Sequence, residues 1–140
     1  MGRAIVEAVR LENSGVKGPL LLCTEGFEAR LSDEAKGYLQ TTNRGDMELR
    51  EVCWPIALFE TATSLNDALL NEYGQFLLAA LNLLKFFAGG RLEVYYLEFA
   101  RLAIRSALLR FPDEKAALEK HIAKVSADIS LLKFLFVDSS

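Results

Sequence analysis

The chain has 140 residues, of which 51% are hydrophobic and 25% are charged, a composition typical of a single globular domain and unlike that of a disordered chain. The net charge of −3, the pI of about 5.2 and the interleaving of Lys and Arg with Asp and Glu exclude the basic patch of a nucleic-acid-binding protein or of a polybasic membrane anchor. The mean hydropathy of +0.18 is high for so short a chain, and such an apolar surplus favours an interface with another molecule.

The first half of the chain predicts a mixture of helices and short strands. Residues 3–13 have apolar side chains at helical spacing, and Asn13-Ser14-Gly15 ends this helix. The apolar run over 20–23 predicts a buried strand, and Thr24 can cap a second helix that carries Phe27 and Leu31 on one face.

A strand–turn–strand unit follows, with strands over 38–41 and 47–59. Asn43 and Gly45 lie in the turn between the two strands and tolerate the positive φ that such a turn requires. In the second strand, apolar residues alternate with charged ones up to Val52, which predicts a half-buried strand with one irregularity. Pro55 predicts a break or a sheet edge near Trp54.

From residue 61 onward the pattern predicts three helices. Ser64 can cap a helix over 65–88, which Gly89-Gly90 ends. The second helix covers 91–111, and its predicted inner face consists of Leu92, Tyr95, Phe99, Leu102 and Leu109. The third begins at Pro112 and has a stripe of Leu118, Ile122, Val125, Ile129, Leu132 and Phe136. The short connections favour an antiparallel three-helix bundle.

Together these elements predict an α+β fold. It consists of a small antiparallel or mixed sheet with two N-terminal helices, followed by the C-terminal three-helix bundle. The one credible boundary lies near residues 60–64. We therefore expect an α+β half over residues 1–60 and a helical half over 61–140 packed on it, either as two domains or as one continuous domain.

Signals for export or membrane insertion are missing from the pattern. The N-terminal segment lacks the hydrophobic region of a signal peptide, and the longest apolar run, Phe76 to Gly90, contains polar residues and is too short to span a bilayer. Cys23 and Cys53 are too few for a disulfide framework. We expect a cytoplasmic protein with reduced thiols and no membrane contact.

The first predicted helix and the strand after it carry a recognisable set of residues, namely Ala8, Arg10, Leu11 and Glu12 with Gly18 ahead of Leu20-Leu21-Leu22-Cys23. This set resembles the C-terminal part of class III nucleotidyl cyclase catalytic domains, in which an Ala-x-Arg-Leu-Glu helix precedes a Gly-led strand. Residues 45–49 and 55–60 look like the closing hairpin of that family, so the resemblance covers residues 2–60.

What the resemblance implies is a half-domain without catalytic machinery. The family's helix carries an Asn four residues before its catalytic Arg. Arg10 matches that Arg, but Val6 stands at the Asn position. The metal-binding aspartates belong to the family's N-terminal half, which we expect this chain to lack. We therefore expect a protein that is not an enzyme, with no catalytic residues, no metal and no cofactor.

A sheet made of one short strand and one hairpin would have open backbone edges. The helical half can cover one face, and a second copy of the chain can cover the rest. We therefore expect a homodimer, or a complex with a larger protein partner.

The aromatic residues of the helical half form the one candidate site. Tyr95, Tyr96 and Phe99 face Phe76, Phe86 or Phe87 if the helices are antiparallel, a pattern typical of core packing or of a small hydrophobic pocket. Trp54 is either an exposed binding residue or a plug between the two halves, and burial favours the plug. The candidate pocket or interface consists of Trp54, Phe76, Phe87, Tyr95, Tyr96 and Phe99.

The polar residues predict no site. Glu98, Arg101 and Arg105 share helical spacing, which predicts a solvent-exposed ion-pair face, with an anion site between the two arginines as the alternative. His121 lacks partners for catalysis or metal binding, and both cysteines are expected to be inert buried thiols.

The sequence thus predicts a non-catalytic interaction or assembly protein that self-associates through an apolar helical surface. The alternative is a protein that binds a small hydrophobic ligand in an aromatic-lined helical pocket.

Overall fold

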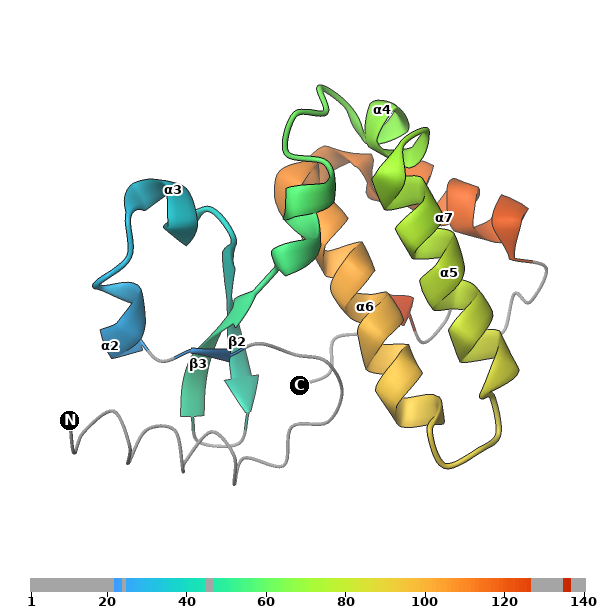
Figure 1. Ribbon diagram of the computed structural model, residues 1–140, viewed down its shortest axis with the longest axis horizontal. Helices are drawn as coiled ribbons and strands as arrows, with labels where there is room; N and C mark the ends of the chain where they lie inside the picture. Colours follow the sequence, from blue (N-terminus) through green and yellow to red (C-terminus); the bar gives the residue numbers. More distant parts are fainter. Residues whose placement is uncertain (1–21, 24, 45–46, 127–134, 137–140) are drawn as a thin grey trace.

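The computed structural model describes residues 22–23, 25–44, 47–126 and 135–136 of the chain. In this part, a small antiparallel sheet is joined to a mostly helical half, so the fold is α+β (Figure 1). None of the described helices is long and apolar enough to span a membrane. The helix predicted over 3–13 lies outside the described residues.

The sheet has three antiparallel strands in the order β1-β3-β2: β1 (Leu22–Cys23), β2 (Leu39–Arg44) and β3 (Met47–Val52). β2 and β3 form a hairpin in which Leu39 pairs with Val52 and Arg44 pairs with Met47. This confirms the predicted strand–turn–strand unit and moves three of its boundaries, since β2 also begins at Leu39 instead of Tyr38. β2 continues to Arg44, and β3 ends at Val52 instead of reaching residue 59.

Proline explains the early end of β3. Pro55 lacks the backbone N–H that a strand ladder needs, and it stands near the start of the 3₁₀ helix η1 (Trp54–Leu58). The hydrogen bond from the Cys53 N–H to the Tyr38 carbonyl, 2.7 Å long, is the last link between the two strands.

The predicted irregularity in β3 is absent, because the pairing with β2 is continuous from Met47 to Val52. Side chains two residues apart share one face of a strand. On this face Leu49 is 1% exposed and Glu51 is 2% exposed. The apolar alternation fails at Glu51, where a carboxylate occupies the inward position.

Two short helices precede the hairpin, α2 (Glu25–Glu28) and α3 (Asp33–Lys36). The Ser32 Oγ caps α3 by accepting a hydrogen bond from the Ala35 N–H at 3.2 Å. The predicted second helix was expected to carry Leu31, but α2 ends before this residue.

The helical half contains the following elements after η1: α4 (Leu65–Leu69), α5 (Glu72–Phe86), α6 (Glu93–Arg110), the 3₁₀ helix η2 (Pro112–Glu114) and α7 (Lys115–Val125). The predicted cap is confirmed, since the Ser64 Oγ accepts a hydrogen bond from the Asp67 N–H at 3.1 Å. The helix predicted over 65–88, however, is two helices, α4 and α5.

The break between α4 and α5 has a local cause. Asn71 has an extended backbone, and its Nδ2 donates to the Asp67 carbonyl at 2.7 Å, which ends α4. α5 then starts so close to α4 that a Cβ on Gly74 would lie 1.8 Å from the Leu69 carbonyl oxygen. This contact requires glycine.

α5 and α6 pack against each other as a helical hairpin (Figure 1). The turn between them contains Gly89, whose φ of +80° favours glycine. α6 presents small side chains to its neighbours, with Ala100, Ala103 and Ala107 all buried. The prediction of the inner face is wrong at the start of this helix, because Leu92 and Tyr95 are exposed. Leu102 is buried as predicted.

α7 is shorter than the predicted third helix. It ends at Val125, and Ser126 has an extended backbone. Serine competes with helix propagation through local hydrogen bonds of its hydroxyl group. Leu118 and Ile122 are buried as predicted, whereas Val125 is exposed. Ile129 and Leu132 lie outside the described residues.

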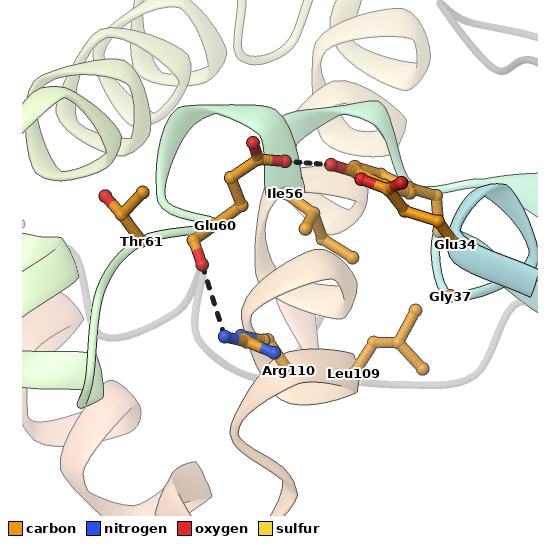
Figure 2. A pocket seen from close by; sticks show the side chains of 8 residues that line it. Glu34, Gly37, Ile56, Glu60, Thr61, Leu109 and Arg110 are labelled. Atoms are coloured by element: carbon orange, nitrogen blue, oxygen red, sulfur yellow. Dashed lines mark hydrogen bonds between the residues drawn. The ribbon is translucent and has the colours of Figure 1, made fainter.

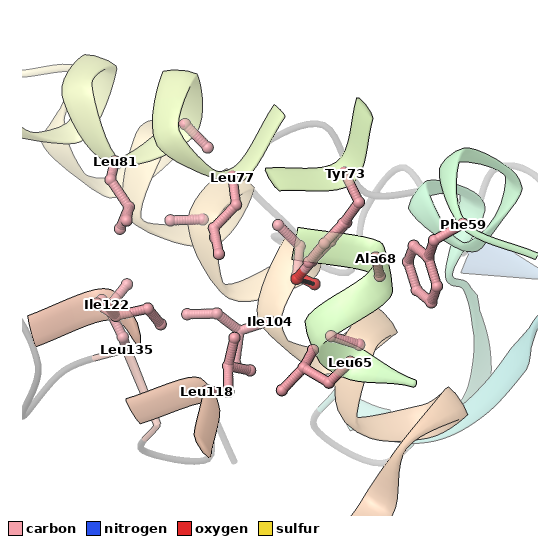
Figure 3. Packing of buried hydrophobic residues seen from close by; sticks show 14 of the residues in the cluster. Phe59, Leu65, Ala68, Tyr73, Leu77, Leu81, Ile104, Leu118, Ile122 and Leu135 are labelled. Atoms are coloured by element: carbon pink, nitrogen blue, oxygen red, sulfur yellow. Dashed lines mark hydrogen bonds between the residues drawn. The ribbon is translucent and has the colours of Figure 1, made fainter. Parts of the chain in front are cut away.

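The core of the helical half lies between these helices (Figure 3). The Tyr73 hydroxyl donates to the Ala103 carbonyl at 2.7 Å and fixes α5 against α6. Figure 3 labels the residues Phe59, Leu65, Ala68, Tyr73, Leu77, Leu81, Ile104, Leu118, Ile122 and Leu135.

Candidate functional site

The six aromatic residues predicted as a site separate into two clusters. The first, the junction cluster, consists of Trp54, Phe76 and Phe99. The ring of Phe76 lies 5.5 Å from that of Trp54 and 5.3 Å from that of Phe99, both edge to face. Trp54 follows the sheet, and its two partners lie on α5 and α6. Trp54 is therefore half-buried against α5 and α6, and its role as a plug between the two halves stays a prediction.

The second cluster lies at the turn between α5 and α6. Phe87 stacks on Tyr96 with ring centres 4.6 Å apart and planes 10° apart. Phe86 contacts Phe87, and Tyr95 contacts Tyr96, so four rings form a continuous series across the turn. Its ends face solvent, with Phe86 79% exposed and Tyr95 41% exposed.

Most of the exposed large hydrophobic side chains of the described residues belong to this hairpin. We call them the hairpin surface, which consists of Leu78, Leu83, Phe86, Leu92, Val94 and Tyr95. Exposed apolar patches of several hundred Å² are uncommon on monomeric proteins. The sequence prediction included Tyr95 and missed the other five residues, because a helical periodicity of apolar residues does not tell an inner face from an outer one.

A pocket of about 460 Å³ lies elsewhere, between α3, η1 and the end of α6 (Figure 2). The Tyr38 hydroxyl donates to the Glu60 carboxylate, and this hydrogen bond raises the pKa of Tyr38. Arg110 Nη2 donates to the Glu60 carbonyl at 3.2 Å. These polar groups thus bind one another. The pocket is lined by Glu34, Gly37, Tyr38, Ile56, Glu60, Thr61, Leu109 and Arg110.

The sequence gives no signal for this pocket, because its lining residues come from three distant segments without a shared spacing. A second pocket of about 370 Å³ lies beside α4. Neither pocket is lined by any of the six predicted aromatic residues.

Ion pairs of α6 in the described part of the chain include Glu98–Arg101 and Glu51–Arg105, and the prediction that these charges face solvent is wrong. Arg105 donates to Glu51 through both Nε and Nη2, at 3.0 and 2.6 Å, although Glu51 is almost fully buried. Arg101 donates to Glu98 at 2.9 Å, and both residues are buried. Arg105 thus reaches β3, where Glu51 supplies the countercharge.

The alternative of an anion site between the two arginines has no support in this arrangement, because the Arg105 guanidinium is already held by Glu51. The second carboxylate oxygen of Glu98 is buried and accepts no hydrogen bond from the described residues.

The thiols are buried and free. Burial raises the pKa of Cys53 to about 11 and also raises the pKa of Cys23, so both are protonated and unreactive at neutral pH. Burial, followed by the charge of Lys124, lowers the pKa of His121. Within the described parts of the chain, His, Cys, Asp and Glu form no group of three or more that could hold a metal ion.

Comparisons with protein-family models, with curated proteins and with solved structures gave no match to this chain. The resemblance to class III nucleotidyl cyclases therefore stays a prediction that depends on the quoted residues. Of these, Ala8, Arg10, Leu11 and Glu12 lie outside the described residues.

Proposed function

We propose that this protein is a non-catalytic interaction module that self-associates through the hairpin surface. One observation carries the proposal. The hairpin of α5 and α6 holds a continuous series of rings whose outer members, Phe86 and Tyr95, are exposed together with Leu83, Leu92 and Val94. Contact of such an apolar surface with a second one lowers the free energy, because both surfaces are removed from water.

The energetics favour a symmetric partner. Burying one Leu, Val or Phe side chain contributes about 1.5–3 kcal/mol, whereas association costs on the order of 4–15 kcal/mol. In a two-fold contact each apolar residue is buried twice, once in each copy. A few large side chains per copy, such as Leu83 and Phe86, then offset the cost of association.

The alternative, a hydrophobic ligand in the aromatic interior, has less support. The rings of the junction cluster contact one another, and the two pockets described above are lined by other residues. We also keep, as a proposal, the division into an α+β half over residues 1–60 and a helical half over 61–140.

Sedimentation equilibrium over the micromolar range tests the self-association. We expect the unchanged protein to be dimeric and the double variant Leu83→Ser/Phe86→Ser to be monomeric with an unchanged circular dichroism spectrum, because both side chains are exposed in the single copy. The variant Val125→Ser is the control. Val125 is exposed to nearly the same extent as Leu83 but lies on α7, so this variant should stay dimeric. An unchanged protein that is monomeric at all these concentrations overturns the proposal.

A further inference from the structure

The outer face of α5 is exposed and uncharged over most of its length. At about 100° per residue its members fall in one arc of the helix. They are Gln75, Leu78, Ala79, Asn82, Leu83 and Phe86. Most exposed helix faces in globular proteins carry charged residues. The absence of charge from this arc indicates that another surface covers it.

The charged residues of α5 stand at its two ends and have opposite signs. Glu72 opens the helix and Lys85 lies in its last turn, about 20 Å away at 1.5 Å per residue. Both side chains are exposed, and neither forms an ion pair with another described residue. The midpoint between them falls between Leu78 and Ala79.

Two polar, uncharged residues of the arc are arranged symmetrically about the same midpoint. Gln75 and Asn82 are placed symmetrically about the midpoint between Leu78 and Ala79, just as Glu72 and Lys85 are. In a two-fold contact, residue i of one copy faces residue j of the other, and j faces i. The outer face of α5 therefore matches itself when a second copy is turned antiparallel.

We propose that two copies of the chain pack α5 against α5 in antiparallel orientation, with the two-fold axis passing between Leu78 and Ala79. This inference rests on the proposed function and specifies its interface. Glu72 of each copy faces Lys85 of the other, Gln75 faces Asn82, and the apolar side chains fill the contact between them. Ala79 at the axis lets the two helices approach to about 8–10 Å.

The charges disfavour the parallel orientation. Parallel packing in register would place Glu72 beside Glu72 and Lys85 beside Lys85, and like charges repel. Antiparallel packing replaces both repulsions by attractions and also sets the helix dipoles against each other favourably.

Charge reversal tests this geometry. We expect Glu72→Lys alone, or Lys85→Glu alone, to raise the dimer dissociation constant about 10-fold at low salt, because each change makes both symmetry-related pairs repulsive. The double variant Glu72→Lys/Lys85→Glu should return to nearly the original dissociation constant, since it restores both pairs with opposite polarity. High salt should remove these differences.

Sedimentation at matched protein concentration measures all four proteins, and circular dichroism checks that each is folded. Two results overturn the antiparallel geometry while leaving the proposed self-association in place: a dimer insensitive to the single reversals, or a double variant that stays weakened. A monomeric unchanged protein overturns both proposals.

Discussion

Glu51 occupies a position that strand periodicity assigns to an apolar side chain. Its neighbour on the same face, Leu49, is buried to a similar extent, and the carboxylate is tolerated there because Arg105 donates two hydrogen bonds to it. A buried pair of this kind is costly to break from one side, because the remaining charge keeps its desolvation cost and loses its counterion.

At this pair we expect Glu51→Leu to lower the free energy of unfolding by about 3–5 kcal/mol. The double variant Glu51→Leu/Arg105→Met removes both charges together, so its free energy of unfolding should fall much less. Urea denaturation of the unchanged protein, the two single variants and the double variant gives the coupling energy. Strictly additive losses would show that the two side chains do not stabilise each other.

Sequence reasoning succeeds at residues whose role is local and fails at residues whose role depends on distant partners. Ser64 caps its helix and Pro55 ends the strand region as predicted, since each acts on the next few backbone groups. The burial of Glu51, Glu98 and Arg101 was not predicted, because nothing in their own segments indicates which surface will cover them.

Among the elements, the join of α4 and α5 shows most directly how one position controls a break. Asn71 ends the first helix, and Gly74 lets the second begin against the Leu69 carbonyl. The hydrophobic pattern runs through this join without interruption, so the sequence predicted a single helix. Two helices form because the side chain of Asn71 and the missing side chain of Gly74 outweigh the apolar pattern.

A methyl group at Gly74 cannot be accommodated without moving α4. We expect Gly74→Ala to lower the free energy of unfolding by about 2 kcal/mol or more, although alanine is the better helix former. Gly37→Ala is the control. The new Cβ would lie 3.2 Å from the Glu34 carbonyl oxygen, a close contact that a small shift relieves. The free energy of unfolding of this variant should therefore fall by less than about 1 kcal/mol. Equal effects in guanidinium denaturation would contradict the close approach of the two helices.

For the remaining helices, the sequence predicted that they exist more accurately than it predicted where they end. α6 matches its predicted range to within two residues at its start, whereas α7 ends at Val125. Of the described members of the predicted stripe, Leu118 and Ile122 are buried, Phe136 is partly buried and Val125 is exposed. Spacing alone does not indicate where a helix stops.

At the scale of the whole molecule, the Glu51–Arg105 pair and the junction cluster around Trp54 connect the sheet region to the helices in the described part of the chain. Both involve the short segment from the end of β3 to the start of η1. This segment is therefore shared by both halves.

Because of these contacts we expect the described sheet and helices to unfold in one cooperative transition. Trp54 is the single tryptophan of the chain, so its fluorescence reports on the junction, while far-ultraviolet circular dichroism reports on the helices. The two urea curves should coincide in midpoint and slope. A fluorescence change that precedes the loss of helix would show that the halves separate before the bundle unfolds.

The candidate site was predicted in part. The six aromatic residues form two separate clusters, and the contacts Phe76–Phe99 and Phe87–Tyr96 between α5 and α6 agree with an antiparallel arrangement of these helices. The exposed members Leu83, Phe86 and Val94 were missed. The signal that could have found those on α5 is the lack of charge between Glu72 and Lys85, since an outward face without charge differs from an ordinary surface helix.

The buried ion pair also has a consequence for how the chain is made on the ribosome. Glu51 is synthesised 54 residues before Arg105. Before that arginine leaves the exit tunnel, Glu51 has no Arg105 side chain to donate to it. We therefore expect the inner side of β3 to become covered only once α6 has been synthesised, and a chain that ends before residue 105 to leave this carboxyl group without that partner.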